Sequence, residues 1–210
     1  MRRGDHGFTL IEIMVVIAII AGLVAAVSLG IPIVQERSRR LTCATNLSDL
    51  GKIYVTWKTE NPNKPPYSGA ALFLHWRKKR EIPRDKESVL ICPGDQQVLS
   101  PDTDPIKDRY DNVDLSNPPN DLCSYAGRDF DTYPWKVDAG ELQIIACARQ
   151  GTDFKTAHHK DGLNVLFDDG SAKFMDREKL GLTQDAQIVV GPESEHAKLK
   201  KVIYSKEKKE

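Results

Sequence analysis

Three side chains in the second half of the sequence have the types that make a covalent hydrolase. They are Cys147 as a nucleophile, His159 as a base and Asp169 as the partner of that base. A thiol becomes reactive when a neighbouring imidazole takes its proton. The surrounding sequence has no nucleophile elbow, no glycine-rich phosphate loop and no metalloprotease helix, which are the local patterns that give such residues a defined geometry. We therefore expect no enzymatic activity.

A second possible chemistry is metal binding by the polar residues of the same stretch, His158, His159, Asp161, Asp168 and Asp169. Two adjacent histidines point in different directions on most backbones. Asp168 and Asp169 lie where the turn of a hairpin is expected. We therefore expect no metal here, and we interpret His159 as a hydrogen-bonding residue that fixes the loop before the hairpin.

The aspartate- and proline-rich stretch 101–121 offers oxygen ligands of the kind that Ca²⁺ prefers. Its candidate ligands are Asp102, Asp104, Asp108, Asp111 and Asp114. Their spacing is not that of the twelve-residue EF-hand loop. The favoured interpretation is a solvated surface loop, so no cofactor is predicted, and Ca²⁺ stays the alternative.

The four cysteines, Cys43, Cys92, Cys123 and Cys147, include no Cys-x-x-Cys pair, which argues against a zinc ribbon. In an oxidising compartment they allow three complete disulfide connectivities. We favour a disulfide between Cys92 and Cys123, because it would join the two ends of the stretch 101–121. Buried free thiols are the alternative.

The charge balance bears on nucleic-acid binding. Thirty Lys and Arg residues against thirty Asp and Glu residues exclude a generally basic nucleic-acid binder. The cluster Trp76-Arg77-Lys78-Lys79-Arg80 places an aromatic ring beside four cations, a combination that can stack a base and hold phosphates. Such a run is more often a solvated helix end, so nucleic-acid binding is not expected.

An uncharged apolar run over residues 13–31 has the length of a membrane span. At 1.5 Å per residue it extends about 28 Å. Residues 10–30 contain twelve Leu, Ile or Val, which favour insertion by about 4 to 7 kcal/mol. The carboxylate of Glu12 opposes insertion by at most about 3 kcal/mol. We therefore expect one membrane-spanning helix over residues 8–31, with no second span.

The elements that follow predict an α+β fold with long loops. Leu41, Ala44, Leu47, Gly51, Tyr54 and Lys58 recur at steps of three or four residues, which predicts that the helix continues as an amphipathic segment over 32–61. Short apolar runs predict strands at 89–92, 142–148, 163–168 and 171–175, with 187–190 as a further edge strand. Asp169-Gly170 between two of them predicts a hairpin. The soluble domain is assigned to 62–190, and the lysine-rich residues 191–210 to a flexible tail.

The N-terminal string Gly7-Phe8-Thr9-Leu10-Ile11-Glu12, after a short basic leader, resembles the prepilin processing signal. Type IV pilins and type II secretion pseudopilins share this signal. A secretory signal peptide cut near Ser28 is the alternative, and a carboxylate in its apolar region would be unusual. A twin-arginine signal would need more than Arg2-Arg3.

The resemblance implies that a prepilin peptidase removes the cytoplasmic leader, residues 1–7, between Gly7 and Phe8. It further implies methylation of the new amine of Phe8, and pairing of Glu12 with that amine on a neighbouring subunit. It places the rest of the chain outside the cytoplasm, anchored in a bacterial inner membrane. The implied partners are the peptidase, other filament subunits and the assembly platform.

Three later strings resemble a pilin-like group that is abundant in planctomycetes and verrucomicrobia. Residues 41–51 are similar to its Cys-x-x-Asn-Leu-x-x-Leu-Gly helix segment, and residues 92–95 to its Cys-Pro-Ser-Asp element, with Gly94 in place of Ser. His159 followed by Asp169-Gly170 resembles its His-x9-Asp-Gly signature, to which we assign a structural role. The resemblance implies a long N-terminal helix packed on a small antiparallel sheet.

Together these features predict a structural subunit of a type II secretion pseudopilus or a type IV pilus-like filament. The alternative is a membrane-anchored envelope protein that binds a ligand and never polymerises. Glu12 and the Gly7-Phe8 junction separate the two hypotheses, because a simple anchor needs neither.

Overall fold

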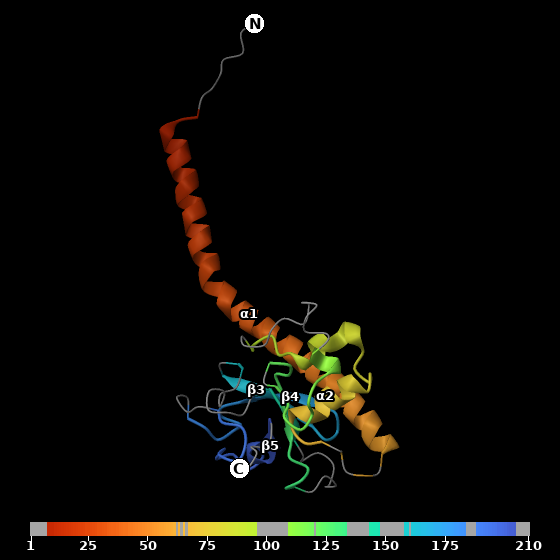
Figure 1. Cartoon of the computed structure of the whole chain (residues 1–210). Coiled ribbons are helices and arrows are strands. Elements are labelled where there is room, and N and C mark those ends of the chain that lie inside the picture. Colours follow the sequence, from red (N-terminus) through yellow and green to blue (C-terminus); the bar gives the residue numbers. More distant parts are fainter. Residues whose placement is uncertain are drawn as a thin grey trace. The chain divides into compact units, whose positions relative to one another are not determined.

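The computed structural model describes residues 8–61, 63, 65, 67–95, 109–119, 121–133, 143–147, 158–159, 161–183 and 188–204. The chain divides into two compact units, Met1–Ser38 and Arg39–Glu210. Helix α1, Leu10–Glu60, runs through both (Figure 1). The leader 1–7, with Gly7, lies outside the described residues.

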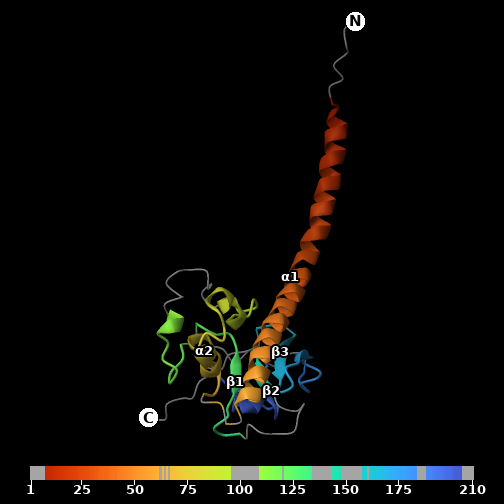
Figure 2. The ribbon, with the colours of Figure 1, turned by 90° about the vertical axis from the view of Figure 1, so that its right-hand side faces the viewer.

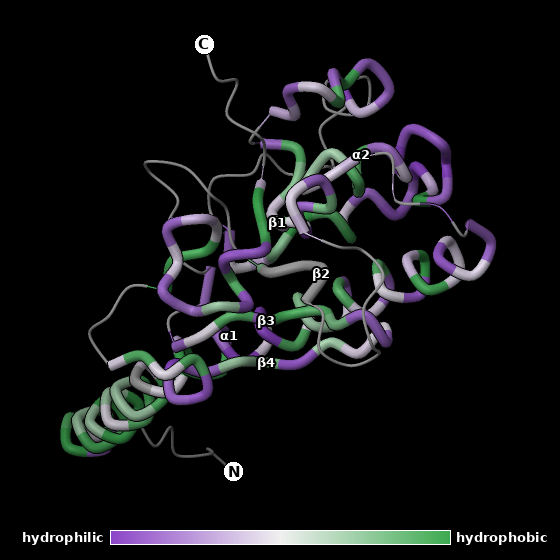
Figure 3. The backbone as a smooth tube through the Cα atoms, turned by 90° about the horizontal axis from the view of Figure 1, so that it is seen from below, coloured by the Kyte–Doolittle hydropathy of each residue, from purple (hydrophilic) through white to green (hydrophobic). Residues whose placement is uncertain are grey.

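The first unit consists of the first stretch of α1. Its side chains are exposed and mostly apolar, and Figure 3 shows this stretch as hydrophobic along its length. The assigned helix is not interrupted at Pro32. Proline at this position removes one backbone hydrogen bond and does not end the element. The long helix that the sequence predicted over 8–61 is therefore confirmed.

The second unit contains one five-stranded antiparallel sheet of order β4-β3-β2-β1-β5. Its strands are β1 (Ala126–Arg128), β2 (Gln143–Ala146), β3 (Gly162–Phe167), β4 (Ala172–Asp176) and β5 (Val202–Ile203). The helical segments are α2 (Ala70–Lys78) and the 3-10 helices η1 (Arg84–Leu90) and η2 (Leu199–Lys201). The predicted α+β fold, with a long helix and a small antiparallel sheet, is confirmed.

The sheet packs against a different part of the chain on each face. On one face, Leu166 of β3 joins a core with Leu47, Leu50 and Tyr54 of α1 and with the apolar side of α2. On the other face, Leu163 and Val165 pack with residues from the segment 180–202. Side chains of one strand alternate between the two faces, so β3 supplies both cores. Figure 2 shows α1 running beside the strands of the sheet.

The predicted hairpin is confirmed. β3 pairs with β4 from Gly162 opposite Asp176 to Leu166 opposite Ala172. Gly170, in the turn, has a φ of 81°, a conformation that glycine adopts at little cost. Part of the predicted strand 142–148 is also present as β2.

Three sequence-based assignments differ from the structure. Val89 and Leu90 are buried at the end of η1, where the sequence predicted a strand over 89–92. Ile188 and Val190 are buried, but residues 188–190 form no strand. In both places a short apolar run indicated burial correctly, and it could not indicate the backbone conformation.

The third difference lies at the C-terminal end. We expected a flexible tail over 191–210, but Val202–Ile203 forms β5 and pairs with β1. Tyr204 is buried, and its backbone oxygen accepts a hydrogen bond from the amide of Ala70 at 2.9 Å. The three apolar residues 202–204 are buried, and this burial orders the segment although lysines flank it in the sequence. Residues 205–210 lie outside the described part of the chain.

Candidate functional site

The N-terminal end of α1 is organised by Thr9 and Glu12. The side-chain oxygen Oε2 of Glu12 accepts hydrogen bonds from the Thr9 amide at 2.7 Å and from the Thr9 hydroxyl at 2.8 Å. The Glu12 amide in turn donates to the Thr9 hydroxyl at 3.3 Å. This reciprocal pattern is a capping box, which satisfies amides that the first helical turn leaves free. Glu12 thus has a local role that the sequence analysis missed, although Thr-x-x-Glu is its signature.

The large apolar side chains of this end of the chain are exposed. Phe8 is 83% exposed and Ile11 is 72% exposed. α1 is long and apolar enough to cross a membrane, and the most apolar stretch has no buried residue. Such a surface is compatible with a membrane anchor.

In the second unit, three thiols and one imidazole meet in the core. Cys147 Sγ lies 3.1 Å from Cys43 Sγ and 2.9 Å from Cys92 Sγ. His159 Nε2 lies 3.5 Å from Cys92 Sγ. All four cysteines of the chain are free thiols. We call Cys43, Cys92, Cys147 and His159 the thiol–imidazole cluster.

The expected disulfide between Cys92 and Cys123 is therefore not present in the structure. Cys92 instead faces Cys147, and Cys123 lies outside the cluster, where its Sγ contacts the backbone of Tyr125. Sequence order suggested the pairing across the stretch 101–121, but the fold brings Cys92 to a strand end more than fifty residues away.

The cluster is closed to solvent. The three cysteines are completely buried and His159 is 2% exposed. Burial raises the pKa of the Cys92 and Cys147 thiols. Burial acts in the same direction on Cys43, but hydrogen bonds with Cys147, Cys92, His159 and Asn164 together lower the pKa of the Cys43 thiol.

The residues proposed for a hydrolase do not form one. Cys147 and His159 both belong to the buried cluster. Asp169 lies in the β3–β4 turn, where its Oδ1 accepts hydrogen bonds from the amide and the hydroxyl of Ser171 at 2.8 Å and 2.6 Å. These bonds lower the pKa of Asp169. Asp169 thus stabilises a hairpin turn.

The turn that Asp169 and Gly170 form packs directly against α1. A Cβ atom on Gly51 would lie 2.8 Å from Leu166 Cδ1 and 2.9 Å from the backbone oxygen of Gly170. A Cβ atom on Gly170 would lie 3.1 Å from Val55 Cγ2. The two glycines therefore permit a close approach of helix and hairpin. This contact gives a structural reason for the Leu-Gly and Asp-Gly ends of the two sequence strings.

Asp168, next to this turn, binds α1 as well. It is buried, accepts a hydrogen bond from the Tyr54 hydroxyl at 2.9 Å and forms an ion pair with Lys58. Burial, and then the nearby charge of Asp168, raises the pKa of Tyr54. Asp161 forms an ion pair at 2.6 Å with Arg40, which lies nearer the N-terminus of α1 than Tyr54 and Lys58. Both carboxylates thus hold the hairpin to the helix.

The cluster at 76–80 does not present its aromatic ring and all four of its cations on the surface. Trp76 and Arg77 are fully buried, and Arg77 forms an ion pair with the buried Glu87. The Trp76 ring packs on Tyr54 and Phe73, so it cannot stack on a base. Sequence alone could not show that the first cation of the run points into the core.

Two of the five candidate calcium ligands, Asp111 and Asp114, lie in the described part of the chain. Asp111 pairs with Arg77 at 3.2 Å and with Arg84, and Asp114 accepts hydrogen bonds from Ser116. Asp102, Asp104 and Asp108 lie outside the described residues. Asp111 and Asp114 therefore have structural partners within the chain.

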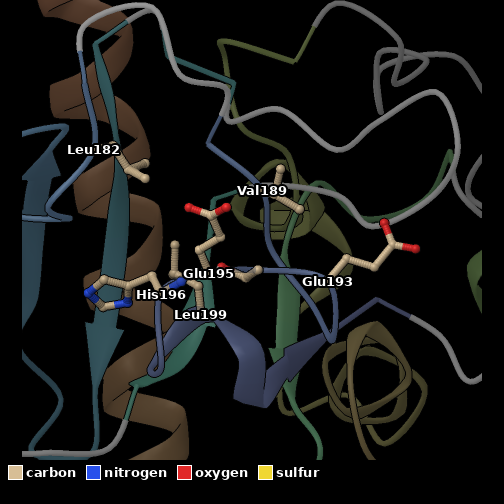
Figure 4. Close-up of a pocket in the computed structure, with 7 residues that line it drawn as sticks. Leu182, Val189, Glu193, Glu195, His196 and Leu199 are labelled. Atoms are coloured by element: carbon tan, nitrogen blue, oxygen red, sulfur yellow. Dashed lines mark hydrogen bonds between the residues drawn. The ribbon is translucent and has the colours of Figure 1, made fainter.

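A surface pocket in the C-terminal segment is lined by few side chains that could take part in a reaction (Figure 4). It is lined by Leu182, Val189, Glu193, Ser194, Glu195, His196 and Leu199. Burial, and then the charge of Lys198, lowers the pKa of His196, which favours a neutral ring. None of the lining residues belongs to the sites that the sequence predicted.

Comparison with known proteins gives one finding. Residues 2–28 match the family model described as the prokaryotic N-terminal methylation motif. This match supports the predicted resemblance to type IV pilin-like proteins in that part of the chain. No curated protein and no solved structure matches.

Proposed function

We propose that this chain is a structural subunit of a filament, either a type II secretion pseudopilus or a type IV pilus-like fibre. A prepilin peptidase would cut it between Gly7 and Phe8, and the new amine of Phe8 would be methylated. The match of residues 2–28 to the N-terminal methylation motif carries this proposal. The exposed apolar stretch of α1 supports it, because this stretch needs a surrounding of lipid or of other helices.

The subunit would be anchored in the inner membrane before assembly, with the soluble unit outside the cytoplasm. One apolar helix near the N-terminus, suited by length and composition to span a membrane, is compatible with this location. An assembly platform would extract the subunit, and the apolar helices would then pack together in the filament. Filament packing replaces lipid as the surrounding of Phe8 and Ile11.

Glu12 would set the register of neighbouring helices. Its carboxylate and the Phe8 amine of another subunit each lose several kcal/mol when transferred alone into hydrocarbon, and a pair recovers part of that loss. In the free subunit, Oε2 of Glu12 accepts two hydrogen bonds from Thr9. The capping box would thus keep the carboxylate in place until a second subunit arrives.

The work of such a subunit is mechanical, and the proposal includes no enzymatic step. The alternative function is a membrane-anchored envelope protein that binds a ligand and does not polymerise. It would need the apolar helix, but it would need neither the junction before Phe8 nor a carboxylate at position 12.

The test is the mass of the intact protein isolated from membranes, with and without a co-expressed prepilin peptidase. We expect a chain that begins at N-methyl-Phe8 when the peptidase is present, and one that keeps residues 1–7 when it is absent. A matched control replaces Gly7 by a bulky residue, which should block cutting without affecting membrane insertion. A chain cut near Ser28, or one uncut in both strains, would contradict the proposal.

A further inference from the structure

We propose that the thiol–imidazole cluster, Cys43, Cys92, Cys147 and His159, binds one zinc ion as a closed structural site. This inference goes beyond the filament function and does not depend on it. It rests on the second unit alone, in which the four residues come from separate parts of the chain.

The distances within the cluster fit a metal site better than a disulfide. The Cys147–Cys43 and Cys147–Cys92 sulfur separations of 3.1 Å and 2.9 Å exceed the roughly 2.05 Å of a disulfide bond. The four donor atoms all lie within 4.8 Å of one another. A tetrahedral zinc ion would hold its sulfur and nitrogen ligands about 3.5 to 3.8 Å apart. Shifts of less than about 1 Å, mainly at Cys147, bring the sulfurs to that spacing.

The number and type of the donors point in the same direction. Three thiols surround one place, and a disulfide between any two would leave the third thiol and the imidazole without a role. Three thiolates and one imidazole are a common ligand set for structural zinc. Soft sulfur ligands also disfavour the hard cations Ca²⁺ and Mg²⁺.

Burial selects a structural site over a catalytic one. A catalytic zinc ion keeps a position open for water or substrate, whereas a structural ion has four protein ligands. Here three ligands are fully buried and His159 is 2% exposed. The cluster therefore leaves no path for a substrate.

Groups around the cluster are arranged to stabilise thiolates. The Gly94 amide points to Cys92 Sγ at 3.4 Å, and the Tyr125 hydroxyl lies 3.9 Å from Cys43 Sγ. Hydrogen bonds from outer groups orient metal ligands and tune their charge. A Cβ atom at position 94 would lie 2.6 Å from the His158 backbone oxygen and 3.1 Å from the His159 ring. Gly94 therefore allows the Cys92 turn to approach the histidine.

A second imidazole lies just outside the four ligands. His158 Nδ1 is 3.6 Å from Cys147 Sγ, and His158 Nε2 is 3.5 Å from Asp95 Oδ2. Both histidines of the pair thus face the cluster region, contrary to the expectation that neighbouring histidines would diverge.

Each ligand joins a different element to the site. Cys43 belongs to α1, Cys92 follows η1, Cys147 follows β2, and His159 precedes β3. The ion would thus link the helix to the sheet and to the segment between them. Removal of the ion should lower the thermal stability of the second unit.

The first experiment measures zinc in the full chain, purified in detergent under reducing conditions and passed through metal-free buffer. We expect about one zinc ion per chain. Replacement of zinc by Co²⁺ should produce the intense visible bands of tetrahedral cobalt and a thiolate-to-cobalt charge-transfer band. These spectra report the ligand type and geometry directly, whatever the activity of the protein.

Matched variants locate the site. Cys147→Ser should lose the bound zinc and the charge-transfer band. Cys123→Ser is the control, because Cys123 is also a buried free thiol but lies outside the cluster. It should keep one zinc ion and an unchanged cobalt spectrum. If Cys147→Ser does not fold, the wild-type spectrum decides the question.

Either of two results with the wild-type chain would overturn the proposal. One is a folded, reduced wild-type chain that takes up neither zinc nor cobalt. The other is a wild-type chain that is two hydrogens lighter when taken directly from membranes, with peptide mapping that places a disulfide between Cys147 and Cys43 or Cys92. Zinc that stays bound in Cys147→Ser and is lost in Cys123→Ser would likewise contradict the assignment.

Discussion

Residues 10–38 and 39–60 belong to the same helix but use their side chains in different ways. In the first stretch, apolar residues are exposed on all sides, and a Cβ atom on Gly22 would meet no atom within 4 Å. In the second, one face is buried against the sheet, and Gly51 is in close contact with the hairpin turn. The side chains of the first stretch therefore face the surroundings of the molecule, whereas one face of the second stretch contacts other parts of the same chain.

The largest expected effect comes from the first stretch. Glu12→Leu should leave membrane insertion and the fold of the second unit intact, but it should abolish incorporation into filaments, because it would remove the proposed partner of the Phe8 amine. The measurement compares subunits in sheared filaments with subunits in membranes. Normal filaments from this variant would refute the pairing of Glu12 with the amine.

Glu12→Gln separates pairing from helix capping. Glutamine can also serve in a capping box, so the hydrogen bonds with Thr9 can persist while the charge is lost. We expect the Gln variant to fail in assembly as Leu does. Assembly at wild-type level would mean that the capping box, rather than the charge, is what the filament needs.

The next largest effect lies in the second unit. Glu87→Gln should lower its free energy of unfolding by about 3 kcal/mol, because it leaves the buried Arg77 without its main counter-charge. Asp49→Asn is the control, since it breaks an exposed pair with Lys52 and should cost less than about 0.5 kcal/mol. Denaturant unfolding, followed by the fluorescence of the buried Trp76, measures both. Equal effects would show that the Arg77 pair is not desolvated.

The two glycines test the comparison within one helix. Gly51→Ala should destabilise the second unit by about 1–2 kcal/mol, because the clash with Leu166 and Gly170 exceeds the gain in helix propensity. Gly22→Ala should change it by less than about 0.5 kcal/mol. Thermal unfolding of both variants in the same detergent gives the difference. A stabilising Gly51→Ala would mean that the hairpin can move away from the helix.

The smallest effect concerns pH. Hydrogen bonds from Ser171 lower the pKa of Asp169, so they stabilise the fold above the unfolded pKa of about 3.9, and this contribution is lost as the pH falls through the lower folded value. Ser171→Ala should raise the pKa of Asp169 and lower stability slightly at neutral pH. The difference from wild type should vanish in acid. Carboxyl titration by NMR measures the pKa, and an unchanged value would exclude the Ser171 hydroxyl as its cause.

Local patterns in the sequence predicted local structure well. The apolar run and the repeat of small and apolar residues from Leu41 predicted α1, and Asp169-Gly170 predicted the hairpin. The errors at 89–92 and 187–190 arose because short buried runs have no periodicity that separates strand from coil or 3-10 helix. The strand at 202–203 was hidden because lysines flank its few apolar residues.

The thiol–imidazole cluster could not be predicted from spacing. Cys43 and Cys147 are 104 residues apart, so no local ligand motif exists. The usable signal was weaker. Cys43 lies one helical turn before Leu47 of the amphipathic stripe, while Cys92 and Cys147 lie at the ends of apolar runs, and each of these positions indicates burial. Only the folded structure, in which α1 packs across the sheet, shows that the three buried cysteines meet at one place.

The position of β5 beside β1 also determines when the sheet can finish folding during synthesis of the chain. Val202 and Ile203 pair with residues of β1 that are synthesised about 75 positions earlier. The amide of Ala70 likewise donates a hydrogen bond to the backbone oxygen of Tyr204, which is synthesised much later. Contacts so distant in sequence form late, because the closure of long loops costs entropy first. The apolar stretch of α1 therefore leaves the ribosome and can reach the membrane well before the sheet can close. Until the sheet closes, the three thiols of the thiol–imidazole cluster are not enclosed by it.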